Sequence, residues 1–152
     1  MLAIDTNLVV RYLTRDHPVQ SPRARALIDG QPVFAAVTVM LEVEWVLRST
    51  YEYSPQQVAA ALRDFGGLPT VTVEDATVIA AALDLAEQGM DFADALHIRK
   101  SAHCDGFATF DRKLVKAAKA TGHGGVLDRI DALLFVIPAT YYLCVLLFDG
   151  GF

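Results

Sequence analysis

Short apolar segments suited to strands alternate along this chain with amphipathic segments that have the helical period. Strands are expected at residues 1–4, 33–37, 71–73 and 106–110. Each is followed by a segment whose apolar residues recur three or four positions apart, the spacing of one helix face. This alternation predicts a three-layer α/β domain with a central, mainly parallel sheet flanked by helices.

Two serine-proline pairs mark the expected starts of helices. Ser21-Pro22 and Ser54-Pro55 each place a capping hydroxyl before a proline at the first helical position. The first pair predicts a short helix over residues 22–29, and the second predicts a helix that ends at Gly66-Gly67.

Later helices are delimited by a glycine and by two acids. An alanine-rich helix is expected over residues 74–88 and is closed by Gly89. Asp91 is expected to cap a helix that runs to about residue 103, and Asp111 opens a basic helix.

Length and composition favour one compact domain with an unusual ending. A chain of 152 residues that is 53% hydrophobic can bury a real core, and we expect one domain at residues 1–125. Residues 126–152 form an atypical apolar tail, in which residues 132–148 carry no charge but contain Pro138. We expect no membrane span, because this run is short and interrupted. Its apolar side chains should be buried: Leu133, Phe135, Leu143 and Leu146.

The start of the chain and its cysteines predict a cytoplasmic protein. No basic segment followed by an apolar run precedes Asp5, so a secretory signal is not expected. Cys104 and Cys144 have neither a metal spacing nor a disulfide framework, and both are expected to be reduced and buried. The net charge of −5 excludes nucleic-acid binding by general phosphate neutralisation, so any such contact must be local.

Four acids are expected at one edge of the sheet. Asp5 and Asp111 each follow an expected strand, and parallel strands direct their carboxyl ends toward a common ligand-binding edge. Glu42 and Asp94 lie in the first turns of helices and can lean over the same edge. Glu42 has apolar neighbours and should need a partner, whereas Glu44 is expected to be solvated.

Such a cluster calls for a cation. Two bare carboxylates about 5 Å apart repel by about 3 kcal/mol at an effective dielectric constant near 20. Hard oxygen ligands favour Mg²⁺ or Mn²⁺, which bind substrate phosphate and activate water, as phosphodiester hydrolysis requires. Each acid alone also fits an ordinary helix cap.

Four segments resemble the signatures of PIN-domain ribonucleases in order and spacing, most closely those of VapC-type toxins. They are IDTN at 4–7, LEVEWVL at 41–47, DFADALHI at 91–98 and ATFDRKL at 108–114, and the resemblance extends from residue 1 to about 125. It implies that four acids bind Mg²⁺ or Mn²⁺ and carry catalysis: Asp5, Glu42, Asp94 and Asp111. It gives supporting roles to Thr6, Asn7 and Thr109, while Asp91 is either an additional acid or a plain helix cap.

The same resemblance implies a function and partners. VapC-like proteins are endoribonuclease toxins of type II toxin-antitoxin systems that act on structured RNA such as tRNA or rRNA. They pair as homodimers and are neutralised by a VapB-like antitoxin. A basic rim of Arg11 and Arg15, opposite Lys113 and Lys116, would suit RNA, although a solvated helix face explains these residues equally well.

Other classes of protein stay open at this point. A PIN-like module could bind a metal or a partner without cleaving RNA. A receiver domain or an aspartyl phosphatase would use Asp5, but both want a further acid close to it, where this chain has Thr6 and Asn7. A stable aspartyl phosphate on Asp5 would separate these classes from a nuclease.

Overall fold

The computed structural model describes residues 1–120. The chain divides into two compact units, Met1–Leu96 and His97–Phe152. The first unit contains a sheet of three parallel strands in the order β1-β2-β3, with Leu2 paired to Val33 and Val33 paired to Val71. The strands fall where the sequence predicts them: β1 at Leu2–Ala3, β2 at Val33–Ala35 and β3 at Val71–Val73.

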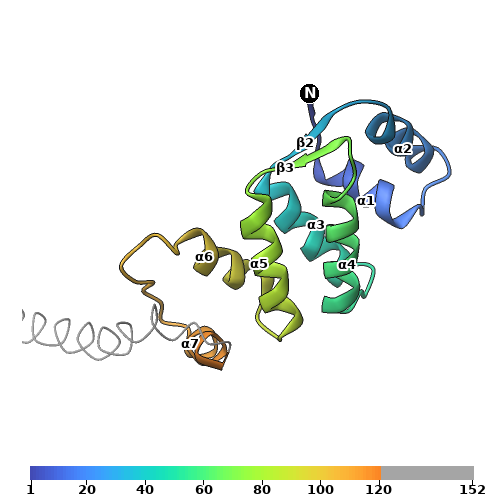
Figure 1. Cartoon of the computed structure of the whole chain (residues 1–152). Coiled ribbons are helices and arrows are strands. Elements are labelled where there is room, and N and C mark those ends of the chain that lie inside the picture. Colours follow the sequence, from blue (N-terminus) through green and yellow to red (C-terminus); the bar gives the residue numbers. More distant parts are fainter. Residues whose placement is uncertain (121–152) are drawn as a thin grey trace, which may run out of the picture. The chain divides into compact units, whose positions relative to one another are not determined.

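Two helices connect each strand to the next, because parallel neighbours need a long crossover connection. Helix α1 packs against α2 and α3, and α4 packs against α3 and α5 (Figure 1). This confirms the predicted three-layer α/β architecture. The helices of this unit are α1 at Thr6–Thr14, α2 at Gln20–Gly30, α3 at Val37–Ser49, α4 at Pro55–Gly66 and α5 at Ala76–Glu87.

The predicted start of α4 is confirmed in atomic detail. The Gln57 backbone N–H donates to the Ser54 hydroxyl at 3.2 Å, and the Ser54 N–H donates to the Gln57 side chain at 2.8 Å. This reciprocal capping box satisfies two backbone donors that the first turn leaves unpaired. The inner face of α4 then buries Leu62 and Phe65 almost completely.

The predicted start of α2 is wrong by two residues. Ser21 lies inside the helix, where its buried hydroxyl accepts the His17 backbone N–H at 3.2 Å. The ring atom Nδ1 of His17 accepts instead from the N–H groups of Val19 and Gln20, at 3.2 and 3.1 Å. A histidine ring thus satisfies the donors that we assigned to a serine cap, and Gly30 is the last helical residue rather than the first one beyond the helix.

Later elements agree with the sequence in part. Helix α6 spans Phe92–Lys100 and ends about three residues before the predicted point, and α7 spans Arg112–Ala120 as expected. The strand predicted at 106–110 is wrong, because this segment pairs with no strand in the described part of the chain. A strand requires a hydrogen-bonded neighbour, and the composition of these five residues does not supply one.

Several predictions concern the chain beyond residue 120. The tail at 126–152, its uncharged run, its four apolar side chains and Cys144 all lie outside the described residues. Within residues 1–120, no helix is long and apolar enough to cross a membrane. Cys104 is a free thiol as predicted, but it is exposed rather than buried, because it lies in the turn that follows α6.

Candidate functional site

Asp5 lies two residues after the end of β1 and caps α1. Its atom Oδ1 accepts the Leu8 backbone N–H at 2.9 Å, as expected of an acid before a helix. The side chain is exposed at the carboxyl end of a parallel strand, the edge at which open α/β sheets bind ligands. Capping uses one carboxylate oxygen and therefore does not prevent a metal from binding the other.

Thr6 joins this strand end to α3. Its hydroxyl donates to Oε2 of Glu42 at 2.5 Å, across 36 positions of the sequence. Thr6 is buried, whereas Glu42 is exposed. The expected partner of Glu42 is therefore a hydroxyl, which orients the carboxylate without neutralising its charge. The structure thereby brings together two predicted site residues and places Glu42 close to the start of α1.

Glu44 corrects the sequence analysis. It was expected to be solvated, yet it is 5% exposed, because Met40 and Leu47 lie four positions before and three after it on the buried face of α3. Burial raises the pKa of its carboxyl, and the ion pair with Arg48 opposes that rise. Nε of Arg48 lies 2.8 Å from Oε1 of Glu44. The spacing of Met40, Glu44 and Leu47 was the signal that we missed.

Arg48 also forms an ion pair with Asp91, at the start of α6. Its atom Nη2 lies 3.3 Å from Oδ2 of Asp91, whose Oδ1 accepts the Ala93 backbone N–H at 3.0 Å. Asp91 is thus the helix cap that one of its two readings predicted. Asp94 follows in the first turn of α6 and is half-buried. The ion pairs of Arg48 with Glu44 and Asp91 therefore hold the start of the helix that carries Asp94.

Asp111 and Thr109 belong to the second unit. Oδ1 of Asp111 accepts the N–H groups of Lys113 and Leu114, at 2.7 and 3.3 Å, so that Asp111 caps α7. The hydroxyl of Thr109 accepts the Asp111 backbone N–H at 3.0 Å. Thr109 therefore shapes the turn that presents Asp111, and its supporting role in a metal site stays a prediction.

The donor chemistry of the predicted acids fits Mg²⁺ or Mn²⁺. All four are carboxylates, and both Asp5 and Glu42 are exposed and open to a cation. In the part of the chain that the structure describes, no three histidine, cysteine or acidic side chains lie close enough to hold a metal ion. The assignment of Asp5, Glu42, Asp94 and Asp111 as a joint metal site thus stays a prediction.

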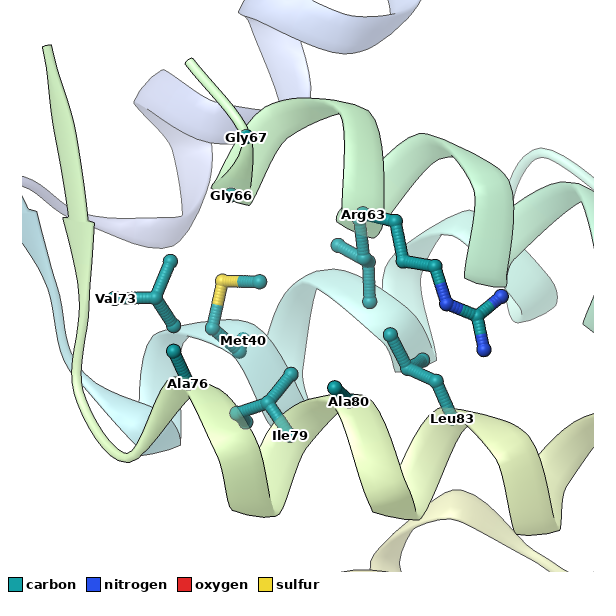
Figure 2. Close-up of a pocket in the computed structure, with 10 residues that line it drawn as sticks. Met40, Arg63, Gly66, Gly67, Val73, Ala76, Ile79, Ala80 and Leu83 are labelled. Carbon is teal, nitrogen blue, oxygen red and sulfur yellow. The ribbon is translucent and has the colours of Figure 1, made fainter. Parts of the chain in front are cut away.

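Two hollows of the first unit have different chemistry. The hollow between α4, α5 and β3 has about 230 Å³, is lined mainly by apolar side chains such as Met40 and Ile79, and contains no acid (Figure 2). Its one charged residue, Arg63, already pairs with Asp84 and Glu87. The other hollow lies between α1 and α2, and Asp5 is one of the polar residues that line it.

The sequence comparisons agree with this arrangement. No curated protein shows significant similarity to the chain. The profile of the cytidylyltransferase family matches residues 118–147, a stretch too short to show membership. The profile of the PIN domain matches residues 2–120, which cover the sheet, α1 to α7 and every predicted site residue. This chain therefore belongs to the PIN-domain family, whose members are usually metal-dependent nucleases.

Proposed function

We propose that this protein is a Mg²⁺- or Mn²⁺-dependent endoribonuclease toxin of the VapC type. The observation that carries the proposal is the pairing of Thr6 with Glu42 beside Asp5, at the ligand-binding edge of a PIN-domain sheet. Three of the four acids that the family resemblance singles out belong to the first unit, and Asp111 belongs to the second.

The residues divide the catalytic work between them. Asp5, Glu42, Asp94 and Asp111 would hold the ion. When bound, a divalent ion supplies Lewis acidity toward the phosphate and lowers the pKa of a water molecule. Thr6 fixes one oxygen of Glu42, and Asp5 is fixed by the Leu8 N–H, so both carboxylates are oriented before a ligand arrives. No side chain needs to form a covalent intermediate.

Cleavage of RNA by the full chain tests this proposal. Wild-type protein is incubated with total tRNA and rRNA in Mg²⁺, in Mn²⁺ and in chelator, beside Asp5→Asn and Glu42→Gln. Both changes keep the side-chain shape but remove a charge from the metal site, so we expect cleavage to fall by about 100-fold or more. Asp64→Asn, an exposed acid on α4, is the matched control and should cleave like wild type.

Wild-type protein that binds Mn²⁺ but cleaves no RNA would instead favour a PIN-like binding module. Cleavage that survives in chelator or in Asp5→Asn would contradict the metal-site proposal directly.

The proposal includes a homodimer and a VapB-like antitoxin. Trp45 on α3 supports an association surface, since this large side chain is 58% exposed, and exposed aromatic residues are typical anchors of protein interfaces. Light scattering on the full chain tests the dimer: a mass near twice 16.5 kDa is expected, and the mass of one chain would contradict it.

A further inference from the structure

A groove between α1 and α2 of the first unit is lined by Asp5 together with other polar and apolar side chains. Its volume is about 460 Å³, which falls within the range of about 300–1,000 Å³ typical of small-molecule sites. Leu8, Ala24 and Leu27 provide apolar surface within it. The full lining also includes polar and charged residues: Asp5, Asn7, Arg11, Gln20 and Arg23.

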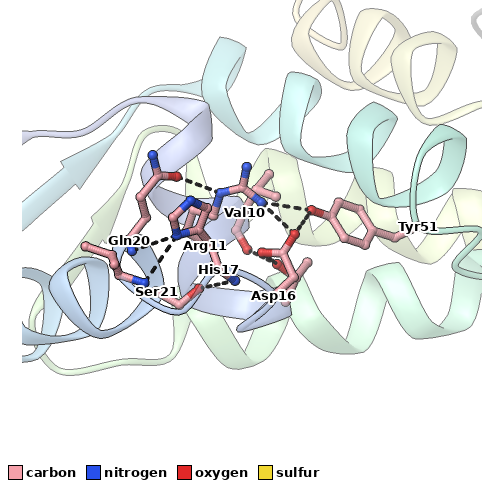
Figure 3. Close-up of polar contacts among 9 residues, drawn as sticks. Val10, Arg11, Asp16, His17, Gln20, Ser21 and Tyr51 are labelled. Carbon is pink, nitrogen blue, oxygen red and sulfur yellow. Dashed lines mark hydrogen bonds and ion pairs between the residues drawn. The ribbon is translucent and has the colours of Figure 1, made fainter.

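Arg11 forms a fixed wall of this groove. Its atom Nη1 lies 2.6 Å from Oδ2 of Asp16 and donates to the Tyr51 hydroxyl at 3.2 Å, while Nε donates to Gln20 at 3.0 Å (Figure 3). These bonds hold α1, the start of α2 and the end of α3 in one arrangement. Because Asp16 neutralises Arg11, this arginine contributes shape to the groove rather than net positive charge.

Arg23 is different, because its charge is available. Its side chain lies on α2 and is exposed. Within residues 1–120 its guanidinium makes no hydrogen bond and no ion pair, and the Asn7 amide on the opposite wall makes none either. The guanidinium presents its N–H donors as a fork, and a guanidinium with unused donors can therefore bind two oxygens of a phosphate.

We infer that the α1–α2 groove binds the nucleotide next to the scissile phosphate of an RNA strand, with Arg23 contacting the phosphate of that nucleotide. This inference rests on the proposed function, which places the scissile phosphate at Asp5. A base can lie along Leu8 and Leu27 only when it has left its stack and its pairing. The groove therefore selects RNA that is unpaired beside the cleavage position, such as a loop.

RNA explains the groove better than an acidic protein segment does. Asp5 in its lining would repel acidic side chains, whereas a nucleic acid approaches Asp5 together with a divalent cation that reverses the local charge. The volume also suits one nucleotide, and the apolar surface, the Asn7 amide and the Arg23 guanidinium provide for base, ribose and phosphate in turn.

The test compares two arginines of α2 in the full chain. Arg23→Gln removes the charge in the groove. Arg25→Gln, two positions along the same helix, is the matched control, because Arg25 stacks over the Tyr12 ring and does not line the groove. Cleavage of an RNA hairpin with an unpaired loop is measured over a range of salt concentrations, beside a fully paired duplex of the same sequence.

We expect Arg23→Gln to raise KM about tenfold with little change in kcat, and to lower the slope of log affinity against log salt by about one. Arg25→Gln should match wild type, and the duplex should be cleaved poorly. Wild-type KM and salt slope in Arg23→Gln, or equal cleavage of the duplex, would overturn the inference while leaving the proposed nuclease intact.

Binding separates the inference from catalysis. The anisotropy of fluorescein-labelled decauridine in Mg²⁺ is measured with each protein, whether or not cleavage occurs. Weaker binding of the RNA by Arg23→Gln, with unchanged binding by Arg25→Gln, supports RNA binding in the groove even if the protein proves not to be a nuclease. No binding by wild type, or displacement of the RNA by a hexaglutamate peptide, would assign the groove to another ligand and overturn the inference.

Discussion

Asp16 shows how a single carboxylate can stabilise a bend in the chain. Its two oxygens receive donors from three residues: Arg11 at 2.6 Å, the Tyr51 hydroxyl at 2.6 Å and the Thr14 hydroxyl at 2.9 Å. The Tyr51 and Arg11 hydrogen bonds lower the pKa of Asp16 well below its usual range. These contacts connect α1 to Tyr51, which lies two residues beyond the end of α3. The charge of Asp16 therefore holds these two parts of the chain together.

This lowered pKa predicts a pH dependence of stability. A group whose pKa is lower in the folded state contributes stability above its unfolded pKa of about 3.9, and the contribution disappears as the pH falls toward the folded value. We therefore expect Asp16→Asn to be less stable than wild type at pH 7, and the difference to shrink steadily below about pH 4.5. Urea unfolding of both proteins across this range measures it, and a gap that stays constant down to pH 2.5 would contradict the assignment.

At the scale of elements, two glycines end helices by different means. Gly66 is the last residue of α4 and has ordinary helical backbone, and an added Cβ would meet Cγ2 of Val73 at 3.5 Å, a normal contact. Gly89 follows α5 with φ +98°, a conformation that side chains disfavour, although the space around it is open.

The two positions should respond to alanine in opposite directions. Gly66→Ala should raise the free energy of unfolding by about 0.5–1 kcal/mol, because alanine loses less backbone entropy in a helix. Gly89→Ala should lower it by about 1–2 kcal/mol through backbone strain. Since both sites have room for a methyl group, urea unfolding of the two variants isolates the backbone effect. Equal shifts of the same sign would show that this explanation is wrong.

The elements that the sequence predicted best depend on local signals. The capping box at Ser54 and the bounds of β3 follow from neighbouring residues, and both are confirmed. The start of α2 was missed because a histidine ring replaced the expected serine cap. The burial of Glu44 and the missing strand at 106–110 depend on what packs or pairs from elsewhere in the chain, which local periodicity does not report.

The candidate site was predictable to a similar degree. The acids came from motifs and their spacing, the need of Glu42 for a partner came from its apolar neighbours, and the structure supplies Thr6 as that partner. Arg48 and Arg23 were not singled out, because an arginine on a helix usually lies on a solvated face. Their importance depends on Asp91 and on the groove beside Asp5, which are brought close only by folding.

At the scale of the whole molecule, the proposed function predicts that all four acids take part in binding the cation. Asp5, Glu42 and Asp94 belong to Met1–Leu96, and Asp111 belongs to His97–Phe152. We therefore expect cation binding to depend on Asp111, although this residue belongs to no strand of the described sheet. Asp111→Asn keeps the cap of α7, since asparagine caps helices as well as aspartate does, so it removes the charge alone.

The most direct test is calorimetric titration of Mn²⁺ into the full chain, comparing wild type with Asp5→Asn, Asp111→Asn and the control Asp64→Asn. We expect both site variants to lose at least about tenfold in Mn²⁺ affinity and the control to keep the wild-type value. Wild-type affinity in Asp111→Asn would contradict the proposed four-acid metal site.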